Sequence, residues 1–299
     1  MLAIGLMSGT SMDGVDAALL ETDGELQIKS LGHLSLSYDT ASSEEILHNT
    51  TAWHQKAVEQ LLRYTHYSSK SIDIIGYHGQ TILHKPTEGI SVQRGDPQIL
   101  ANTFGIPVIS QFRQNDLQHG GQGAPLAPLY HQALAIRDGL TPVAIVNIGG
   151  IANITLITGP DYKDIFACDT GPGNTFIDRY LKLKTENKVC MDKDGRYGLR
   201  GKIHQHIITA LYEKSAGHYF TLSAPKSLDL TDLTLIPELN ELSIEDACAT
   251  LAAFTAHTII NSIKTAPPVW VIAGGGAKNP VIMRELARSA HQIKTADEI

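Results

Sequence analysis

The feature of this 299-residue sequence that most constrains its fold is an order of elements that occurs twice. Apolar runs predict strands at 2–7, 15–21 and 26–36, a helix over 44–64 capped by Ser43, and a buried strand at 72–76. The order returns as strands at 142–148, 151–157 and 165–168, helices at 175–183, 202–214 and 244–263, a strand at 269–273 and a helix at 280–289. We therefore expect an α/β protein with two domains, 1–140 and 141–299, meeting at Thr141-Pro142, with mixed sheets flanked by helices and a ligand cleft between the domains.

Composition excludes several other classes of protein. Hydrophobic residues make up 42% and charged residues 18%, as in folded globular chains. The net charge of −7 gives no basic surface for nucleic acid. Because no apolar run approaches the ~20 residues of a membrane span and no signal peptide precedes the first strand, we expect a cytoplasmic protein without a membrane partner. The three cysteines lie far apart, which favours reduced thiols. A homodimer is compatible with the sequence, which does not fix the oligomeric state.

The stretch AIGLMSGTSMDGVDAAL, residues 3–19, interrupts an apolar run with a loop rich in glycine and hydroxyl groups. It lacks the lysine of a Walker A motif and leads into a strand, so it is neither a P-loop nor a Rossmann fingerprint. Its backbone N–H groups could converge on an anion, and Asp13 and Asp16 could hold a metal beside phosphates. A plain hairpin turn set by Asp13-Gly14 is an equally open alternative on this segment alone.

The stretch IFACDTGPGNTFIDRY, residues 165–180, places Asp169 after an apolar strand and before a sharp bend. A carboxylate at a strand end that faces a cleft can work as a base, and Gly171 and Gly173 would let the backbone approach a ligand. The alternative is a turn with helix capping near Asn174. Since residues 3–19 also contain a Gly-Thr turn after a strand, in what we take to be the corresponding place of the other half, the pair favours a phosphate clamp.

Two more glycine runs follow predicted strands. WVIAGGGAKNP, residues 270–280, would allow a flat ligand to lie against bare backbone, and VNIGGIANITL places Gly149 and Gly150 in a hairpin turn. Tight turns without a ligand explain both runs equally well.

Two stretches, 76–86 and 92–128, gather uncharged donors and acceptors with few apolar residues, which suits a polyhydroxylated ligand such as a sugar. Arginine there could pair with a carboxylate or phosphate. The polar residues singled out are His78, Gln80, His84, Arg94, Asp96, Arg113, Asn115, Asp116 and Gln118. Each histidine could instead be a satisfied interior or surface residue, His84 more so than His78, and Asp116 could cap a turn.

Together and in this order, the segments resemble the anhydro-N-acetylmuramic acid kinases. The matching pieces are GLMSGTSMDGVDAAL, GYHGQT, QRGDPQILA, NDLQHGGQGAPLAPLYH, VNIGGIANIT, CDTGPGN with Asp178, and GGGAKNP. That family belongs to the sugar-kinase/Hsp70/actin superfamily. The resemblance implies two ribonuclease-H-like domains with ATP in the cleft, and phosphorylation of O6 of 1,6-anhydro-N-acetylmuramic acid while water opens the anhydro bridge.

The resemblance, with the patterns above, gives an expected set of site residues. Asp169 would be the catalytic base that deprotonates water, and Asp13 and Asp16 would hold Mg²⁺. Sugar contacts are expected at Gln80, Arg94, Asp116 and Asn174. ATP contacts are expected at Gly9, Thr10, Ser11, Met12, Asp13, Gly14, Val15, Asp16, Gly149, Gly171, Gly274, Gly275 and Asn279.

Two other functions stay open: a non-catalytic nucleotide- or sugar-binding remnant of the family, and a hexosamine kinase acting on a free hydroxyl. The resemblance also implies a further GxDGDxxEA-type segment with another cleft carboxylate, about where the sequence stops at KTADEI, so we expect a second domain that is truncated at its end. APKSLDLTDL stands where the family has a PPKSTGRE-like stretch.

Overall fold

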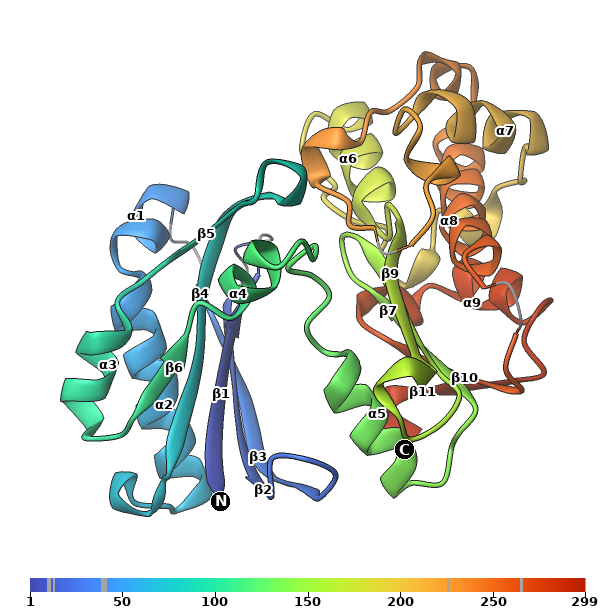
Figure 1. The fold of residues 1–299 in the computed structure, drawn as a ribbon. Helices are drawn as coiled ribbons and strands as arrows, with labels where there is room; N and C mark the ends of the chain where they lie inside the picture. The colour runs from blue at the N-terminus through green and yellow to red at the C-terminus, as the bar shows by residue number, and fades with distance from the viewer. Residues whose placement is uncertain (10–11, 13, 39–41, 225, 264–265, 299) are drawn as a thin grey trace. The chain divides into compact units, whose positions relative to one another are not determined.

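The structure, a computed structural model, describes residues 1–9, 12, 14–38, 42–224, 226–263 and 266–298. The chain divides into two compact units, Met1–Leu126 and Ala127–Ile299 (Figure 1). The division precedes the expected boundary at Thr141-Pro142 because helix α5 (Pro128–Arg137) packs on strands of the second unit. In the described ranges, none of the helices combines the length and apolar character needed to cross a bilayer.

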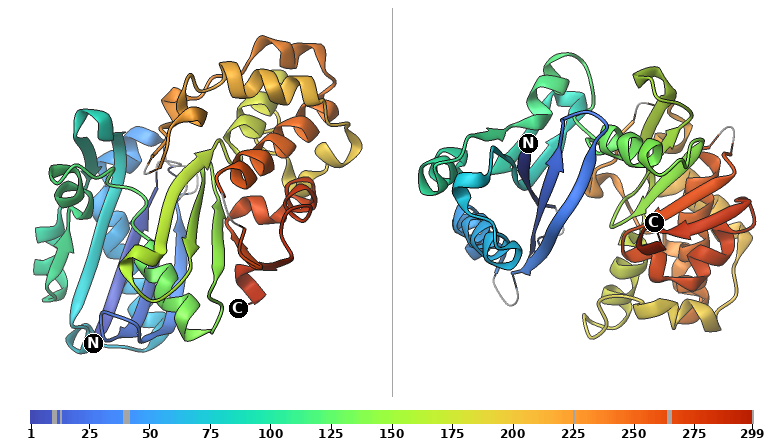
Figure 2. Two further views of the ribbon diagram at one scale, coloured as in Figure 1. Left: turned by 45° about the vertical axis from the view of Figure 1, so that its right-hand side comes forward. Right: turned by 90° about the horizontal axis from the view of Figure 1, so that it is seen from below.

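The first unit is built on a six-stranded mixed sheet with the order β3-β2-β1-β4-β5, and β6 pairs with β4. The first three strands are antiparallel, whereas β4 is parallel to β1, and β6 is parallel to β4. Helix α2 packs along β2, β3 and β4, and the further views in Figure 2 show it lying against the sheet. The elements are β1 (Leu2–Ser8), β2 (Gly14–Thr22), β3 (Ile28–Ser37), α1 (Ser43–His48), α2 (Thr50–Thr65), β4 (Ile74–Lys85), β5 (Ile90–Arg94), α3 (Pro97–Phe104), β6 (Val108–Ser110) and α4 (Phe112–Gln118).

The helix expected over 44–64 is two helices that meet at Asn49. Its cap is Ser42 rather than Ser43, since the Ser42 hydroxyl accepts a hydrogen bond from the Glu45 N–H at 3.2 Å. The strand expected at 72–76 continues as β4 to Lys85, so the polar GYHGQT stretch is part of the sheet.

The second unit repeats the strand order of the first. Its sheet runs β11-β10-β7-β8-β9, with β7, β8 and β9 antiparallel in turn, β10 parallel to β7, and β11 parallel to β10. The two-fold order is therefore confirmed, as β1, β2, β3, β4 and β6 correspond to β7, β8, β9, β10 and β11. The elements are β7 (Val143–Ile148), β8 (Ala152–Ile157), β9 (Ile165–Gly171), α6 (Thr175–Lys184), α7 (Gln205–Lys214), α8 (Ile244–Asn261), β10 (Val269–Ala273), α9 (Pro280–Leu286) and β11 (Gln292–Thr295).

One expected correspondence is wrong. The loop between β1 and β2 has its counterpart in the Gly149-Gly150 turn between β7 and β8, because each joins the first two strands of its sheet. The turn after Asp169 follows β9, which is the third strand of its sheet. Glycine and threonine are adjacent in both places, as Gly9-Thr10 after β1 and as Thr170-Gly171 at the end of β9, but the strands are not equivalent.

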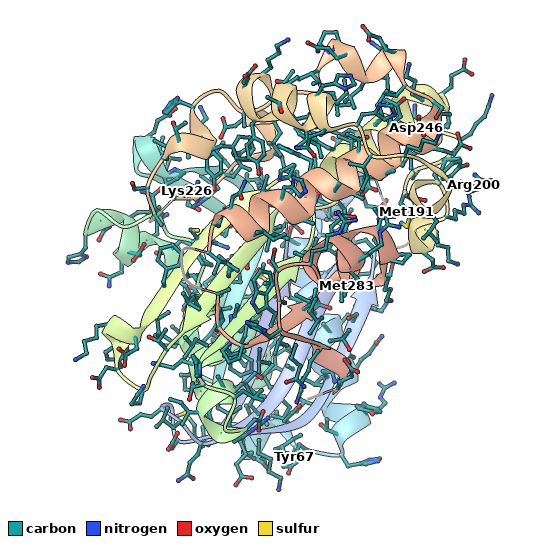
Figure 3. The ribbon with its side chains drawn as sticks, turned by 90° about the vertical axis from the view of Figure 1, so that its right-hand side faces the viewer. Tyr67, Met191, Arg200, Lys226, Asp246 and Met283 are labelled. Carbon is teal, nitrogen blue, oxygen red and sulfur yellow. The ribbon has the colours of Figure 1, made fainter. Side chains whose placement is uncertain are left out.

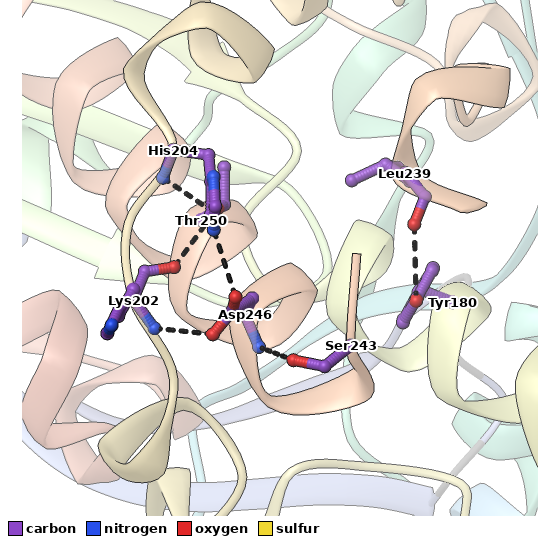
Figure 4. Close-up of polar contacts among 7 residues, drawn as sticks. All are labelled: Tyr180, Lys202, His204, Leu239, Ser243, Asp246 and Thr250. Atoms are coloured by element: carbon purple, nitrogen blue, oxygen red, sulfur yellow. Dashed lines mark hydrogen bonds and ion pairs between the residues drawn. The ribbon is translucent and has the colours of Figure 1, made fainter. Parts of the chain in front are cut away.

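Helix α8 forms the centre of the second core, buried through most of its length against β8, β9, α6, α7 and α9. The Ser243 hydroxyl caps its first turn at Asp246 N, 3.1 Å away. The Asp246 carboxylate accepts from Lys202 N at 2.8 Å and lies 2.9 Å from His204 Nε2 (Figure 4). These contacts fix the start of α8, and so its position on the sheet that carries Asp169.

Candidate functional site

Three glycine turns lie at one end of the second sheet. Strands β7, β9 and β10 run toward the same end, where Ile148 pairs with Ala152 and Ala152 pairs with Gly171. The chain leaves this end through the turns 149–151, 172–174 and 274–276. Asp169 lies on β9, two residues before that strand ends at Gly171. Segments that are far apart in the sequence thus meet at one sheet edge, as expected for a ligand site in a mixed sheet.

Packing explains some of these glycines and not others. Gly173 has φ +30°, and a Cβ there would lie 2.4 Å from the Gly149 carbonyl oxygen. A Cβ on Gly171 would lie 2.6 Å from Thr258 Oγ1, and one on Gly274, which has φ +80°, would lie 2.7 Å from the Ile148 carbonyl oxygen.

Gly149 and Gly275 differ from these glycines. A Cβ on either would have its nearest neighbour at 3.5 Å and 3.8 Å respectively, which is ordinary contact. Neither has φ in the left-handed region. The fold therefore leaves room for a side chain at both positions, and the expected contact of their backbone with ATP stays a prediction.

Asp169 is buried, with 8% of its surface exposed, and is held at three atoms. Its Oδ2 accepts from Leu228 N at 2.9 Å, its N–H donates to the Lys226 carbonyl at 3.1 Å, and its carbonyl accepts from the Tyr219 hydroxyl at 2.8 Å. A carboxylate fixed in this way can accept a proton from a bound water or hydroxyl. The sequence did not indicate these three partners, which come from a stretch without periodicity.

Two asparagines of the expected site also build the turns. Asn279 accepts from the N–H groups of Val281 and Ile282 at 3.0 and 3.4 Å, which makes it the N-cap of α9. Asn174 precedes α6 and donates through Nδ2 to the Ile148 carbonyl at 3.3 Å. The structure thus gives both a structural role, and their contacts with ATP and sugar stay predictions.

In the first unit, Gln80 is fully buried and supports the loop after β1. Its Nε2 donates to the Gly9 carbonyl at 2.5 Å, and its Oε1 accepts from the Tyr38 hydroxyl at 3.2 Å. The Gly9 carbonyl also accepts from Met12 N at 3.2 Å. Thr10, Ser11 and Asp13 lie outside the described residues.

Val15, Gly14 and Asp16 begin β2. Val15 is fully buried in the core, and its expected contact with ATP stays a prediction. A Cβ on Gly14 would lie 2.6 Å from the Leu36 carbonyl oxygen, so packing requires this glycine. Asp16 is exposed and accepts from Ser35 Oγ at 2.5 Å. Within the described residues, no group of three His, Cys, Asp or Glu side chains is arranged to hold a metal.

His78 is an interior residue in a fixed hydrogen-bonding state. Its Nδ1 lies 2.8 Å from the Gly79 carbonyl, so Nδ1 carries the proton and Nε2 accepts from Arg113 Nε at 3.0 Å. Burial, and then the Arg113 charge, lower the pKa of His78 to about 4. Burial likewise lowers the pKa of His54, 3.2 Å from Ser8 Oγ, to about 4. Both are neutral at pH 7.

Of the remaining polar residues of the first unit, one holds a turn and another is exposed. Asp116 Oδ2 accepts from Gly123 N at 2.6 Å, so it holds a turn, as the alternative from the sequence stated. Arg94 is exposed on β5 and pairs in register with Gln80 on β4. The structure thus brings Gly9, Gln80 and Arg94 together.

Comparison with known proteins identifies the family that the whole chain resembles. The family model for anhydro-N-acetylmuramic acid kinase matches residues 1–299. The anhydro-N-acetylmuramic acid kinase of Zymomonas mobilis is 41% identical over 314 residues, covering 96% of this chain and 84% of that protein. That of Rhodopseudomonas palustris is 38% identical, covering 100% of this chain and 87% of that protein.

Among solved structures, component A of the (R)-2-hydroxyglutaryl-CoA dehydratase of Acidaminococcus fermentans has a similar fold. The TM-score is 0.53 at 11% identity, with 99% of this chain and 92% of that chain covered. This similarity concerns the α/β fold alone. The match over the full sequence and the two relatives place the chain in the anhydro-N-acetylmuramic acid kinase family.

Proposed function

We propose that this chain uses ATP to phosphorylate O6 of 1,6-anhydro-N-acetylmuramic acid while water opens the anhydro bridge, giving N-acetylmuramic acid 6-phosphate for cell-wall recycling. Water adds to C1, the C1–O6 bond breaks, and O6 takes the γ-phosphoryl group. The proton of the water goes to the Asp169 carboxylate. No further reactant is needed, since the water and the phosphoryl group account for every atom gained by the sugar.

The observation that carries this proposal is Asp169, whose carboxylate is held by Leu228 N and whose main chain is held by the Tyr219 hydroxyl, at the sheet edge where three glycine turns meet. A base that activates water must be fixed relative to its substrate, because misplacement of a reacting group by ~1 Å costs about 10²-fold in rate. The hydrogen bond from Leu228 N fixes the carboxylate itself, and the Tyr219 hydroxyl fixes the main chain that carries it.

ATP is expected at the backbone of Gly149 and Gly275, two glycines of the sheet-edge turns whose Cβ positions are open. In the first unit, the Gly9 loop would contact phosphates through its N–H groups. The buried Gln80 amide supports this loop from below by bonding the Gly9 carbonyl. This role differs from the sugar contact expected for Gln80 and does not need an exposed side chain.

Mg²⁺ fits the donors that are present. The ion commonly keeps several waters and takes one or two carboxylates beside substrate phosphates, so the exposed carboxylate of Asp16 suffices as one protein ligand. When bound, the ion would supply positive charge that offsets the charge on the phosphates. Arg94, exposed on β5 opposite Gln80, could pair with an anionic group of the sugar.

A kinase assay with 1,6-anhydro-N-acetylmuramic acid, ATP and Mg²⁺ in ¹⁸O-water tests the proposal. We expect ADP release that depends on the anhydro sugar, and product labelled at C1 above the level set by anomeric exchange. Nucleotide binding without ADP release would favour the binding-protein alternative. Phosphorylation of a free hexosamine without incorporation of water would favour the hexosamine-kinase alternative.

A further inference from the structure

A cavity of about 330 Å³ lies against β9, where its lining includes both sequence neighbours of Asp169, Cys168 and Thr170. The pairing of β9 with β8 is irregular at this point, since Asp169 pairs with Asn153 and Gly171 with Ala152. The volume falls at the lower end of the ~300–1,000 Å³ typical of small-molecule sites. Its lining includes Lys226, whose carbonyl accepts the Asp169 N–H, but none of the residues expected to contact ATP, sugar or metal. The lining is Phe166, Cys168, Thr170, Tyr212, Phe220, Thr221, Leu222, Ser223, Ala224, Lys226, Thr258, Asn261 and Ser262.

The charged group of the cavity is the ammonium of Lys226. It donates to the Tyr219 carbonyl at 3.3 Å and lies 4.5 Å from the centre of the Tyr219 ring. Within the described part of the chain, no carboxylate lies within 4.0 Å of it. Burial lowers its pKa, which shows that the cation is poorly solvated and would gain from an anion beside it. Figure 3 shows Lys226 toward one end of α8 and Asp246 toward the other.

The walls of the cavity are aromatic and fixed. The rings of Tyr212 and Phe220 meet edge to face with centres 5.1 Å apart, and Phe166 lines the cavity from the strand. The Tyr212 hydroxyl accepts from Asn261 Nδ2 at 2.8 Å, which orients its ring. Aromatic walls with one cation match an anion that has a planar apolar body.

The residues that wall this cavity also hold Asp169. Lys226 contributes its ammonium to the cavity and its carbonyl to the Asp169 N–H. Tyr219, beside the cavity residue Phe220, contacts the Lys226 ammonium and donates its hydroxyl to the Asp169 carbonyl. A ligand that orders Lys226 therefore acts on the main chain of Asp169 through the contacts of Lys226 and Tyr219.

We propose that this cavity binds a small organic carboxylate with a planar apolar body, its carboxylate paired with Lys226, and that occupancy tightens the hold on Asp169. The site is separate from the proposed ATP and sugar contacts. The proposal does not depend on the proposed function.

Binding of benzoate to the intact chain tests the site, with benzyl alcohol as the uncharged probe of similar shape. We expect benzoate to bind at least about tenfold more tightly than benzyl alcohol, because only benzoate pairs with the cation. Lys226→Met should remove that advantage. Lys163→Met, which removes an exposed lysine of the same unit, is the matched control and should leave benzoate affinity within about twofold.

A second variant keeps the test decisive if Lys226→Met does not fold. Ser223 is exposed at the cavity, so Ser223→Trp fills it without removing the charge and should also abolish benzoate binding. Equal binding of the two probes, or benzoate affinity unchanged by these cavity variants, would overturn the site. Saturating benzoate should also slow hydrogen exchange at the Asp169 amide in the wild type, and unchanged exchange would overturn the link to Asp169.

Discussion

The two units share one sheet order but use their polar side chains in different ways. In the first unit, Gln80, His78 and Asp116 direct their hydrogen bonds to the backbone of nearby loops or to another side chain of the unit. In the second, the main chain and a tyrosine direct theirs to Asp169. Polar groups thus build loops in both units, but in the second unit they also position a carboxylate, because Leu228 N and the Tyr219 hydroxyl bond Asp169.

This difference separates support from chemistry within a repeated fold. A buried amide or neutral histidine with its hydrogen bonds satisfied fixes a loop and does not take up a proton at pH 7. A carboxylate that is held by donors but lies at a sheet edge keeps its ability to accept a proton. Equivalent topology therefore does not imply equivalent roles, and variants at matched positions of the two units can show this directly.

The largest contrast is expected between Asp169→Asn and Asp116→Asn, which remove the same charge from the two units. Asparagine at 169 can still accept from Leu228 N but cannot take a proton from water, so turnover should fall by about 10²–10⁴. Asp116→Asn should reduce turnover by less than about tenfold, because Asn Oδ1 can keep the hydrogen bond from Gly123 N. Steady-state ADP release measures both. Normal turnover in Asp169→Asn would show that the base is another residue.

The next contrast compares two glycines. Gly173→Ala places a Cβ 2.4 Å from a carbonyl oxygen at φ +30°, and we expect it to lower the free energy of unfolding by roughly 2–4 kcal/mol. Gly5→Ala, in β1, meets nothing within 4 Å and should leave stability unchanged or raise it by up to about 1 kcal/mol. Urea unfolding followed by circular dichroism measures both variants. Equal stabilities would mean that the 149–150 and 172–174 turns do not pack closely in solution.

The strand order was predictable because alternating apolar runs and turn residues are local signals, and the expected strand 269–273 is the observed β10. The sequence pattern did not predict the helices and strands of residues 90–137. Its strands β5 and β6 are short, and helices α3 and α5 begin at Pro97 and Pro128 among polar residues. Prolines at these positions start helices, but the same residues also mark loops.

The residues that hold Asp169 were not predictable from local pattern. Leu228 is 59 positions and Tyr219 50 positions away from it in sequence, and neither lies in a periodic segment. The glycine turns also did not reveal from sequence which strands pair. A turn with adjacent glycine and threonine near a strand end looks alike whether the strand is first or third in its sheet, and only the strand pairing distinguishes the two cases.

The pH dependence of stability should also differ between the units. His54 and His78 of the first unit have pKa values lowered to about 4, below the ~6.5 of an unfolded chain, so the unfolded state binds more protons between these values. The first unit should therefore lose stability as pH falls from 6.5 toward 4. The loss at pH 5 is at most about 2 kcal/mol for each histidine.

In the second unit two shifts oppose each other. His131 has its pKa lowered to about 4 by burial, whereas burial raises the pKa of Asp178 to about 6. The folded state thus takes up a proton at Asp178 as pH falls through 6, which offsets part of the loss from His131. Hydrogen exchange at pH 7 and pH 5, corrected for intrinsic rates, should show the larger loss in the first sheet. Equal losses would contradict this, and Asp178→Asn should make the second sheet more sensitive to acid.

The smallest expected effect concerns the hydroxyl that holds Asp169. Tyr219→Phe removes the 2.8 Å hydrogen bond to the Asp169 carbonyl and keeps the buried ring, so stability should fall by about 1 kcal/mol. Tyr212→Phe is the matched control, since its hydroxyl bonds Asn261 and belongs to the same aromatic cluster. If Tyr219 positions Asp169, turnover should fall about 3- to 10-fold in Tyr219→Phe while the KM for ATP stays constant, and Tyr212→Phe should lose comparable stability with unchanged turnover. Equal turnover in the two variants would mean that the Tyr219 hydrogen bond to Asp169 stabilises the second unit without aiding the proton transfer.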